Sequence, residues 1–177
     1  MCNSESFKID LNGLKAGVTT FHYDLDDAYF RLVESQDVNG GRVHARLDVN
    51  RIDDNFALDF SIAGVVTVPC DLCLDDMEQP ITTSGSLTAK LGDEYSDSDD
   101  QVTVDSDNGM LDVSWFIYEF IALAIPVKHV HTPGKCNPAM IKALEEHSAA
   151  RSGEEKAEAV VDPRWKELEK LKTIIKD

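Results

Sequence analysis

The sequence predicts an α+β fold in which one apolar helix packs on an antiparallel sheet. Three consecutive segments between residues 42 and 91 alternate apolar and polar residues with period two, as strands with one buried face do. An almost unbroken apolar run follows at 113–125, and capped helical patterns occupy the C-terminal part. We therefore expect an antiparallel β-meander, open or barrel-like, packed by a buried apolar helix, with peripheral C-terminal helices.

The N-terminal region predicts two strands and a short helix. The segments "SFKIDLNGL" and "GVTTFHYDL" are rich in strand-forming residues, and Gly13 ends the first. In "DLDDAYFRLVES" the period becomes helical, and either Asp24 or Asp26 is placed to cap the helix. We expect a helix of about two to three turns there.

The meander is predicted from its alternation. Val43, Ala45, Leu47 and Val49 share one face, and Phe56, Leu58, Phe60 and Ile62 do the same in the next strand. The third strand is "ITTSGSLTAKL", at 81–91. Arg42, His44 and Arg46 fall on the opposite face of the first strand, which we expect to be solvated.

The segment "VSWFIYEFIALAIPV" predicts a helix over 113–125 that ends at Pro126. Because the run is apolar nearly all round, we expect a central, buried helix with Trp115, Phe116, Phe120 and Leu123 in the core. Glu119 interrupts the run, and we expect it to be buried and paired with an arginine or a backbone group.

The chain divides by pattern into a single α+β domain at 1–136 and a helical extension at 137–177. The extension contains "NPAMIKALEEHSAARSG" and "DPRWKELEKLK", each with a proline in the first turn. Between them, a stretch near 152–161 looks like a mobile linker. The acidic segment "GDEYSDSDDQVTVDSD" is expected to form a loop beside a short strand, "QVTV".

Composition limits the possible functions. The 177 residues are 42% hydrophobic and 28% charged, which is typical of a globular protein. A net charge of −16 argues against a protein that grips bare nucleic acid and suits a basic protein partner. No secretory leader or run long enough to cross a bilayer is evident, so we expect a cytoplasmic protein without a membrane partner.

The cysteines supply the one candidate site. Cys70 and Cys73 form a C-x2-C pair at a strand end, and His131 with Cys136 forms an H-x4-C pair after the apolar helix. These four residues can bind zinc tetrahedrally, and unliganded thiols are the alternative. A redox pair at Cys70 and Cys73 is a third interpretation, but acids and Pro80 follow instead of a helix N-terminus. The sequence contains no nucleophile elbow, P-loop or dinucleotide glycine motif, so an enzyme is not supported.

The order of "TVPCDLCL", an acidic loop, "IYEFIALAIPVKHVH", a further cysteine and a terminal "DPRWKELEKLK" resembles the YceD family of large ribosomal RNA subunit accumulation proteins. The resemblance runs along nearly the whole chain, from the early strand-and-helix region to the last helix.

This resemblance implies a non-enzymatic role in the accumulation of large-subunit ribosomal RNA. It maps the family's cysteines onto Cys70, Cys73 and Cys136, with His131 or His129 as fourth ligand of a structural zinc. Together with the acidity, it implies a basic ribosomal protein or a large-subunit assembly intermediate as partner, with direct RNA contact secondary. A thiol-dependent redox protein is the alternative function.

Overall fold

The computed structural model describes residues 4–93, 96–98 and 101–147. Strands form a six-stranded sheet, in the order β2-β3-β4-β5-β7-β6, and a two-stranded sheet of β1 and β8. The six-stranded sheet comprises β2 (Gly17–Leu25), β3 (Gly40–Ile52), β4 (Asn55–Pro69), β5 (Asp76–Gly92), β6 (Ser96–Ser98) and β7 (Gln101–Asp105). β1 (Lys8–Asp10) and β8 (Met110–Asp112) form the second. The predicted α+β class is confirmed.

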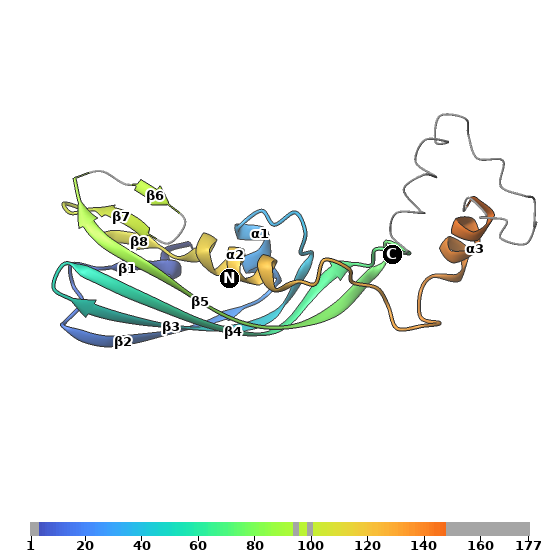
Figure 1. Cartoon of the computed structure of the whole chain (residues 1–177), viewed down its shortest axis with the longest axis horizontal. Helices are drawn as coiled ribbons and strands as arrows, with labels where there is room; N and C mark the ends of the chain where they lie inside the picture. Colours follow the sequence, from blue (N-terminus) through green and yellow to red (C-terminus); the bar gives the residue numbers. More distant parts are fainter. Residues whose placement is uncertain (1–3, 94–95, 99–100, 148–177) are drawn as a thin grey trace, which may run out of the picture. The chain divides into compact units, whose positions relative to one another are not determined.

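Four helices accompany the strands in the described part of the chain. They are the 3-10 helix η1 (Ser4–Phe7) and the α-helices α1 (Asp27–Leu32), α2 (Ser114–Ala124) and α3 (Pro138–His147). Figure 1 shows α1, α2 and the small sheet over one face of the large sheet. None of the described helices is long and apolar enough to cross a bilayer.

The antiparallel meander is confirmed for β3, β4 and β5, which pair in sequence order. Next to β5, however, β7 runs parallel to it. The chain leaves β5, forms β6 at the outer edge and turns back, so β7 takes the direction of β5. The described strands form an open sheet with β2 and β6 at its edges, so the barrel-like variant is wrong.

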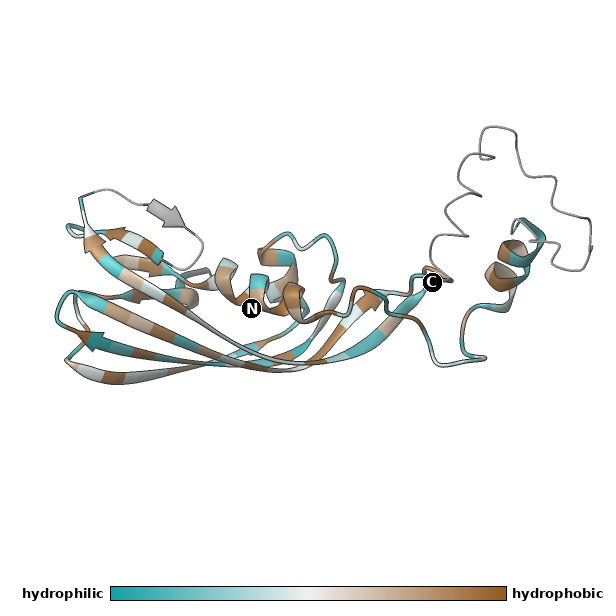
Figure 2. Cartoon of the chain, viewed as in Figure 1, coloured by the Kyte–Doolittle hydropathy of each residue, from teal (hydrophilic) through white to brown (hydrophobic). Residues whose placement is uncertain are grey.

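The alternation of residues along the strands sets which face is buried. Val43, Leu47 and Val49 of β3 are buried, whereas Arg42, His44 and Arg46 are exposed, as predicted. The buried set of β4 is Phe56, Leu58, Phe60 and Ile62. In Figure 2 apolar and polar residues alternate along these strands. The core therefore lies between one face of the sheet and the helices.

Helix α2 packs on β4 and β5. Ile117 and Ile121 are fully buried, and the ring centroids of Phe120 and Phe60 lie 5.0 Å apart. Close approach is possible because Gly85 lies beneath Phe120: a methyl group there would come within 2.1 Å of Cε1 of the ring.

The expectation that α2 is buried all round is wrong. Phe116 is buried and Phe120 partly buried, but Trp115 is 51% exposed and Leu123 83% exposed. Residues 115, 119 and 123 are four apart, so they share a stripe that points away from the sheet. Glu119 is also exposed, and it accepts a hydrogen bond from the indole N–H of Trp115 at 3.0 Å.

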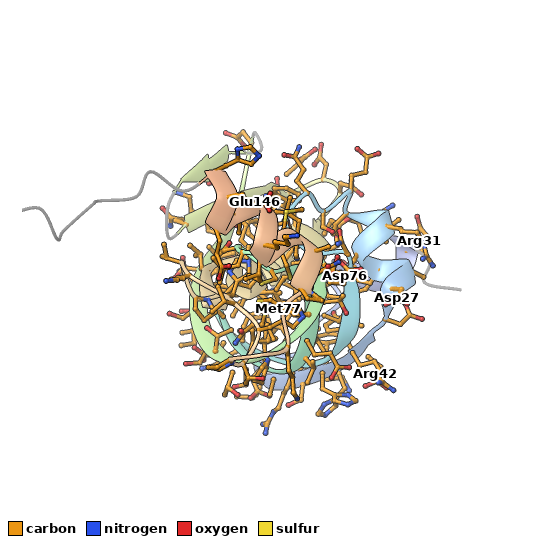
Figure 3. The ribbon with its side chains drawn as sticks, turned by 90° about the vertical axis from the view of Figure 1, so that its right-hand side faces the viewer. Asp27, Arg31, Arg42, Asp76, Met77 and Glu146 are labelled. Carbon is orange, nitrogen blue, oxygen red and sulfur yellow. The ribbon has the colours of Figure 1, made fainter. Side chains whose placement is uncertain are left out.

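Helix α1 confirms one of the two expected caps. The carboxylate of Asp26 accepts hydrogen bonds from the backbone N–H groups of Ala28 and Tyr29. The Tyr29 hydroxyl donates to the carbonyl of Ser114 at 2.8 Å, which ties α1 to the start of α2. In Figure 3 the side chains of Asp27, Arg31 and Arg42 point outward near α1 and the start of β3.

The chain contains two compact units, residues 1–142 and 143–177. Helix α3 confirms the first C-terminal helix, and the Asn137 side chain caps it by accepting from the N–H of Ala139 at 3.1 Å. The linker predicted near 152–161 and the helix predicted at "DPRWKELEKLK" lie outside the described residues. The division at residue 137 stays a prediction.

Candidate metal centre

The first part of the site is the turn between β4 and β5, residues 70–75, which we call the knuckle loop. The N–H of Leu74 donates to the carbonyl of Cys70, and the N–H of Cys70 donates to the carbonyl of Asp75, both at 2.9 Å. At the start of β5, Asp76 accepts from the side-chain amide of Asn39 at 2.6 Å. These bonds hold Cys70 and Cys73 in one tight turn at the end of the two strands.

The second part is the segment that follows α2. Pro126 lies just beyond the last turn of that helix, and the chain continues without regular structure to α3. The N–H of Asp71 donates to the carbonyl of His129 at 3.0 Å, and the N–H of His129 donates to the Asp71 carboxylate at 2.7 Å. This pair of bonds attaches the segment to the knuckle loop across 58 positions of sequence.

The attachment brings four donor atoms together. Cys70, Cys73, His131 and Cys136 each offer a ligand atom, and all four atoms lie within 4.8 Å of one another. The Cys73 sulfur lies 3.3 Å from Nδ1 of His131, and the Cys70 and Cys136 sulfurs are 3.9 Å apart. Nδ1 of His131 is also 3.9 Å from the Cys136 sulfur.

These separations fit a tetrahedral metal site. With Zn–S bonds of about 2.3 Å and Zn–N bonds of about 2.0 Å, neighbouring ligand atoms lie about 3.5–3.8 Å apart. Three of the six separations, at 3.3–3.9 Å, lie close to that range, and all six are within 4.8 Å. Three sulfurs and one imidazole also form a soft donor set of the kind that selects zinc.

The pKa values of Cys70 and Cys136 shift in opposite directions. Burial by itself raises the pKa of Cys70, but hydrogen bonds from the backbone of Cys73, Leu72 and His131 and from the His131 side chain lower it to about 6. Burial, followed by the neighbouring sulfurs of Cys70 and Cys73, raises the pKa of Cys136 to about 11. A cation among these groups would offset the repulsion between thiolates.

The structure distinguishes the two candidate histidines by position. Nδ1 of His129 hydrogen-bonds the carbonyl of Pro126 at 2.9 Å, and Nε2 lies 3.7 Å from the Asp71 carboxylate. His131 is the histidine that joins the cysteine cluster. Sequence reasoning did not find Asp71, whose contact with His129 has no periodic or motif signal.

The fold and the cluster define the chain as an α+β protein with a compact Cys3His centre at a hairpin end. The family model for the large ribosomal RNA subunit accumulation protein YceD matches residues 58–172. This range is more than half of the 177 residues, and the chain belongs to the YceD family. The match begins within β4, so the family resemblance is confirmed over less of the chain than predicted.

Comparison with curated proteins and with solved structures found no significant match.

Proposed function

We propose that this chain is a non-enzymatic ribosome-biogenesis factor that supports accumulation of large-subunit ribosomal RNA. The observation that carries the proposal is the family match, which spans the knuckle loop, α2 and the segment between α2 and α3. The factor acts through a protein partner, either a basic ribosomal protein or a large-subunit assembly intermediate.

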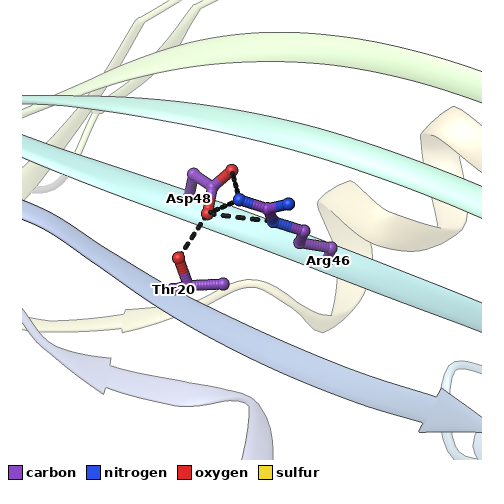
Figure 4. A network of polar contacts seen from close by, with 3 residues as sticks. All are labelled: Thr20, Arg46 and Asp48. Atoms are coloured by element: carbon purple, nitrogen blue, oxygen red, sulfur yellow. Dashed lines mark hydrogen bonds and ion pairs between the residues drawn. The ribbon is translucent and has the colours of Figure 1, made fainter.

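Charge supports a protein partner. The net charge of −16 attracts basic proteins and repels RNA phosphates. The exposed basic residues of β3 are Arg42, His44 and Arg46. They reduce this negative charge little, because two of them already have acidic partners. Arg46 pairs with Asp48 at 2.8 Å, and Nδ1 of His44 lies 2.5 Å from the Asp24 carboxylate. Figure 4 shows the Arg46 pair together with Thr20.

We assign zinc a structural role in this proposal, with Cys70, Cys73, His131 and Cys136 as its ligands. All four positions belong to protein side chains, as in closed structural sites. Such an ion would lock the knuckle loop to the segment after α2, which the Asp71–His129 contact already aligns.

Burial weighs against the redox alternative. Thiol–disulfide exchange requires an accessible attacking sulfur. The pKa of Cys70 is lowered to about 6, which favours a thiolate, but Cys70 is 0% exposed and Cys73 2% exposed. A thiolate enclosed in this way is better suited to hold a metal than to attack a disulfide in another protein.

The test is deletion of the gene in its source organism. Large-subunit ribosomal RNA should fall relative to small-subunit ribosomal RNA, and the intact protein should restore the ratio. Purified protein should retain large-subunit proteins after RNase treatment, and added salt should weaken that binding. An unchanged RNA ratio in the deletion strain would contradict the proposal.

A further inference from the structure

The knuckle loop contains a backbone conformation that its sequence does not favour. Leu74 has a φ of 62°, in the left-handed region. In this region Cβ crowds the following carbonyl oxygen, so glycine, and to a lesser degree asparagine, is favoured. The hydrogen bond from the N–H of Leu74 to the carbonyl of Cys70 fixes the turn in this conformation.

The strain is not offset by burial of the leucine side chain. Leu74 is 68% exposed and Leu72, on the other side of Cys73, is 41% exposed. A branched apolar residue in this place therefore contributes little to folding, while glycine would fit the backbone better. Backbone strain that persists at an exposed position is typical of functional sites.

Acidic residues surround the two leucines. Asp71, Asp75 and Asp76 are all exposed. Asp71 and Asp76 are held by hydrogen bonds, whereas the Asp75 carboxylate has no partner among the residues that the structure describes. Asp76 and Met77 mark this end of the hairpin in Figure 3.

A groove borders the knuckle loop at Asp71. Its volume is about 350 Å³, and Asp71 lines it together with Asp37, Ile125, Pro126 and Val127. Val127 is fully exposed. The groove thus repeats the combination of apolar side chains and carboxylates that the knuckle loop presents.

We propose that Leu72, Leu74 and Asp75 dock a Lys- or Arg-rich segment of a partner protein that also carries an apolar side chain. The apolar side chain contacts the leucines, and the basic groups face the carboxylates. Ribosomal RNA fits this surface poorly, because leucine side chains cannot hydrogen-bond or pair with phosphate groups and the carboxylates repel them. A second copy of the chain brings the same net charge of −16. The inference rests on the proposed function and names the surface that binds its partner.

The test compares variants of the full-length, zinc-loaded chain. The probe is the set of proteins extracted from purified large ribosomal subunits, freed of RNA, and each retained protein is quantified by mass spectrometry. Leu74→Gly should reduce retention of the bound protein at least fivefold and leave the unfolding temperature unchanged or higher. Leu74→Asn should reduce retention in the same way, and it replaces Leu74→Gly in the test if the glycine variant folds poorly.

The matched control is Val18→Ser, because Val18 on β2 is 65% exposed and outside the knuckle loop. It should leave retention unchanged. Asp75→Asn should weaken retention more at low salt than at high salt, whereas Asp59→Asn on the outer face of β4 should not. Wild-type retention by both Leu74 variants, or equal loss in Val18→Ser, overturns the proposed surface.

A complementation assay separates failure of this surface from failure of the proposed function. If the wild-type gene restores the large-subunit RNA ratio and Leu74→Gly restores it fully, the surface is wrong and the function stands. If the deletion strain never shows an altered ratio, the function itself is wrong. Binding of naked large-subunit RNA that is lost in Leu74→Gly, with protein retention intact, also overturns the docking proposal.

Discussion

Asp71 and His129 are joined by two reciprocal hydrogen bonds, one at 3.0 Å between backbone groups and one at 2.7 Å from the His129 N–H to the Asp71 carboxylate. Asp71 follows Cys70 directly, and His129 precedes His131 by two residues. The contact therefore sets the distance between the two halves of the Cys3His centre. It acts on the site without offering a ligand of its own.

Replacing Asp71 by alanine should weaken zinc binding. The substitution removes the carboxylate that accepts from His129, so the segment with His131 is held less firmly. Loss of partners of this kind costs about 10- to 100-fold in metal affinity. Competition with a chromophoric chelator measures the change, and Asp75→Ala is the matched control. Equal affinities in the two variants would show that the contact does not support the site.

Substitution of the two histidines should have unequal effects on zinc content. Only His131 places a ring nitrogen in the cluster, at 3.3 Å from the Cys73 sulfur. Protein purified without chelator should contain about one zinc per chain in the wild type and in His129→Ala, and clearly less in His131→Ala. Elemental analysis checks this result. A zinc-free wild type, or loss confined to His129→Ala, would contradict the ligand set.

The fold was predictable where the spacing of apolar residues in the sequence fitted only one kind of secondary structure. The alternation at Val43, Leu47 and Phe60 predicted the central strands and their buried face, because a strand with one wet face must alternate. Helix α2 was placed correctly, but its exposed face was not. An apolar run does not show which side lacks a neighbour, and Trp115 and Leu123 lie on that side.

The site was predictable in composition and not in assembly. The spacing of Cys70 and Cys73 indicated one pair of donors, but spacing cannot bring His131 across 58 positions from Cys73. That approach depends on where α2 ends and on the contact between Asp71 and His129. The left-handed conformation of Leu74 was equally hidden, because leucine at that position gives no local signal for it.

A methyl group added at Gly85 should destabilise the fold. It would come within 2.1 Å of Cε1 of Phe120, so α2 would have to move away from β5. Gly85→Ala should lower the free energy of unfolding by about 1–3 kcal/mol, as overpacking does. Urea unfolding measures it, with Ser84→Ala on the exposed face as control. Adding Phe120→Leu should recover part of the loss; no recovery would place the strain elsewhere.

Removal of the Thr20 hydroxyl should change how stability depends on pH. The hydroxyl donates to the Asp48 carboxylate at 2.5 Å (Figure 4). This bond, with a smaller contribution from Arg46, lowers the pKa of Asp48 from its ordinary 3.8. A carboxyl group whose pKa is lower in the folded state stabilises the fold above the unfolded pKa, and that stabilisation is lost as the pH falls through the folded pKa.

Thr20→Val should therefore raise the pKa of Asp48 and reduce the stability gained between acid and neutral pH. Valine also changes strand propensity and packing, but those effects are nearly independent of pH and shift the whole curve equally. Carboxyl-carbon NMR follows the Asp48 titration, and urea unfolding at neutral and acid pH follows stability. Thr88→Val, an exposed position on β5, should leave the Asp48 titration unchanged. If Asp48 titrates identically in wild type and Thr20→Val, the Thr20 hydroxyl is not the cause of the lowered pKa, and Arg46 and His22 account for it.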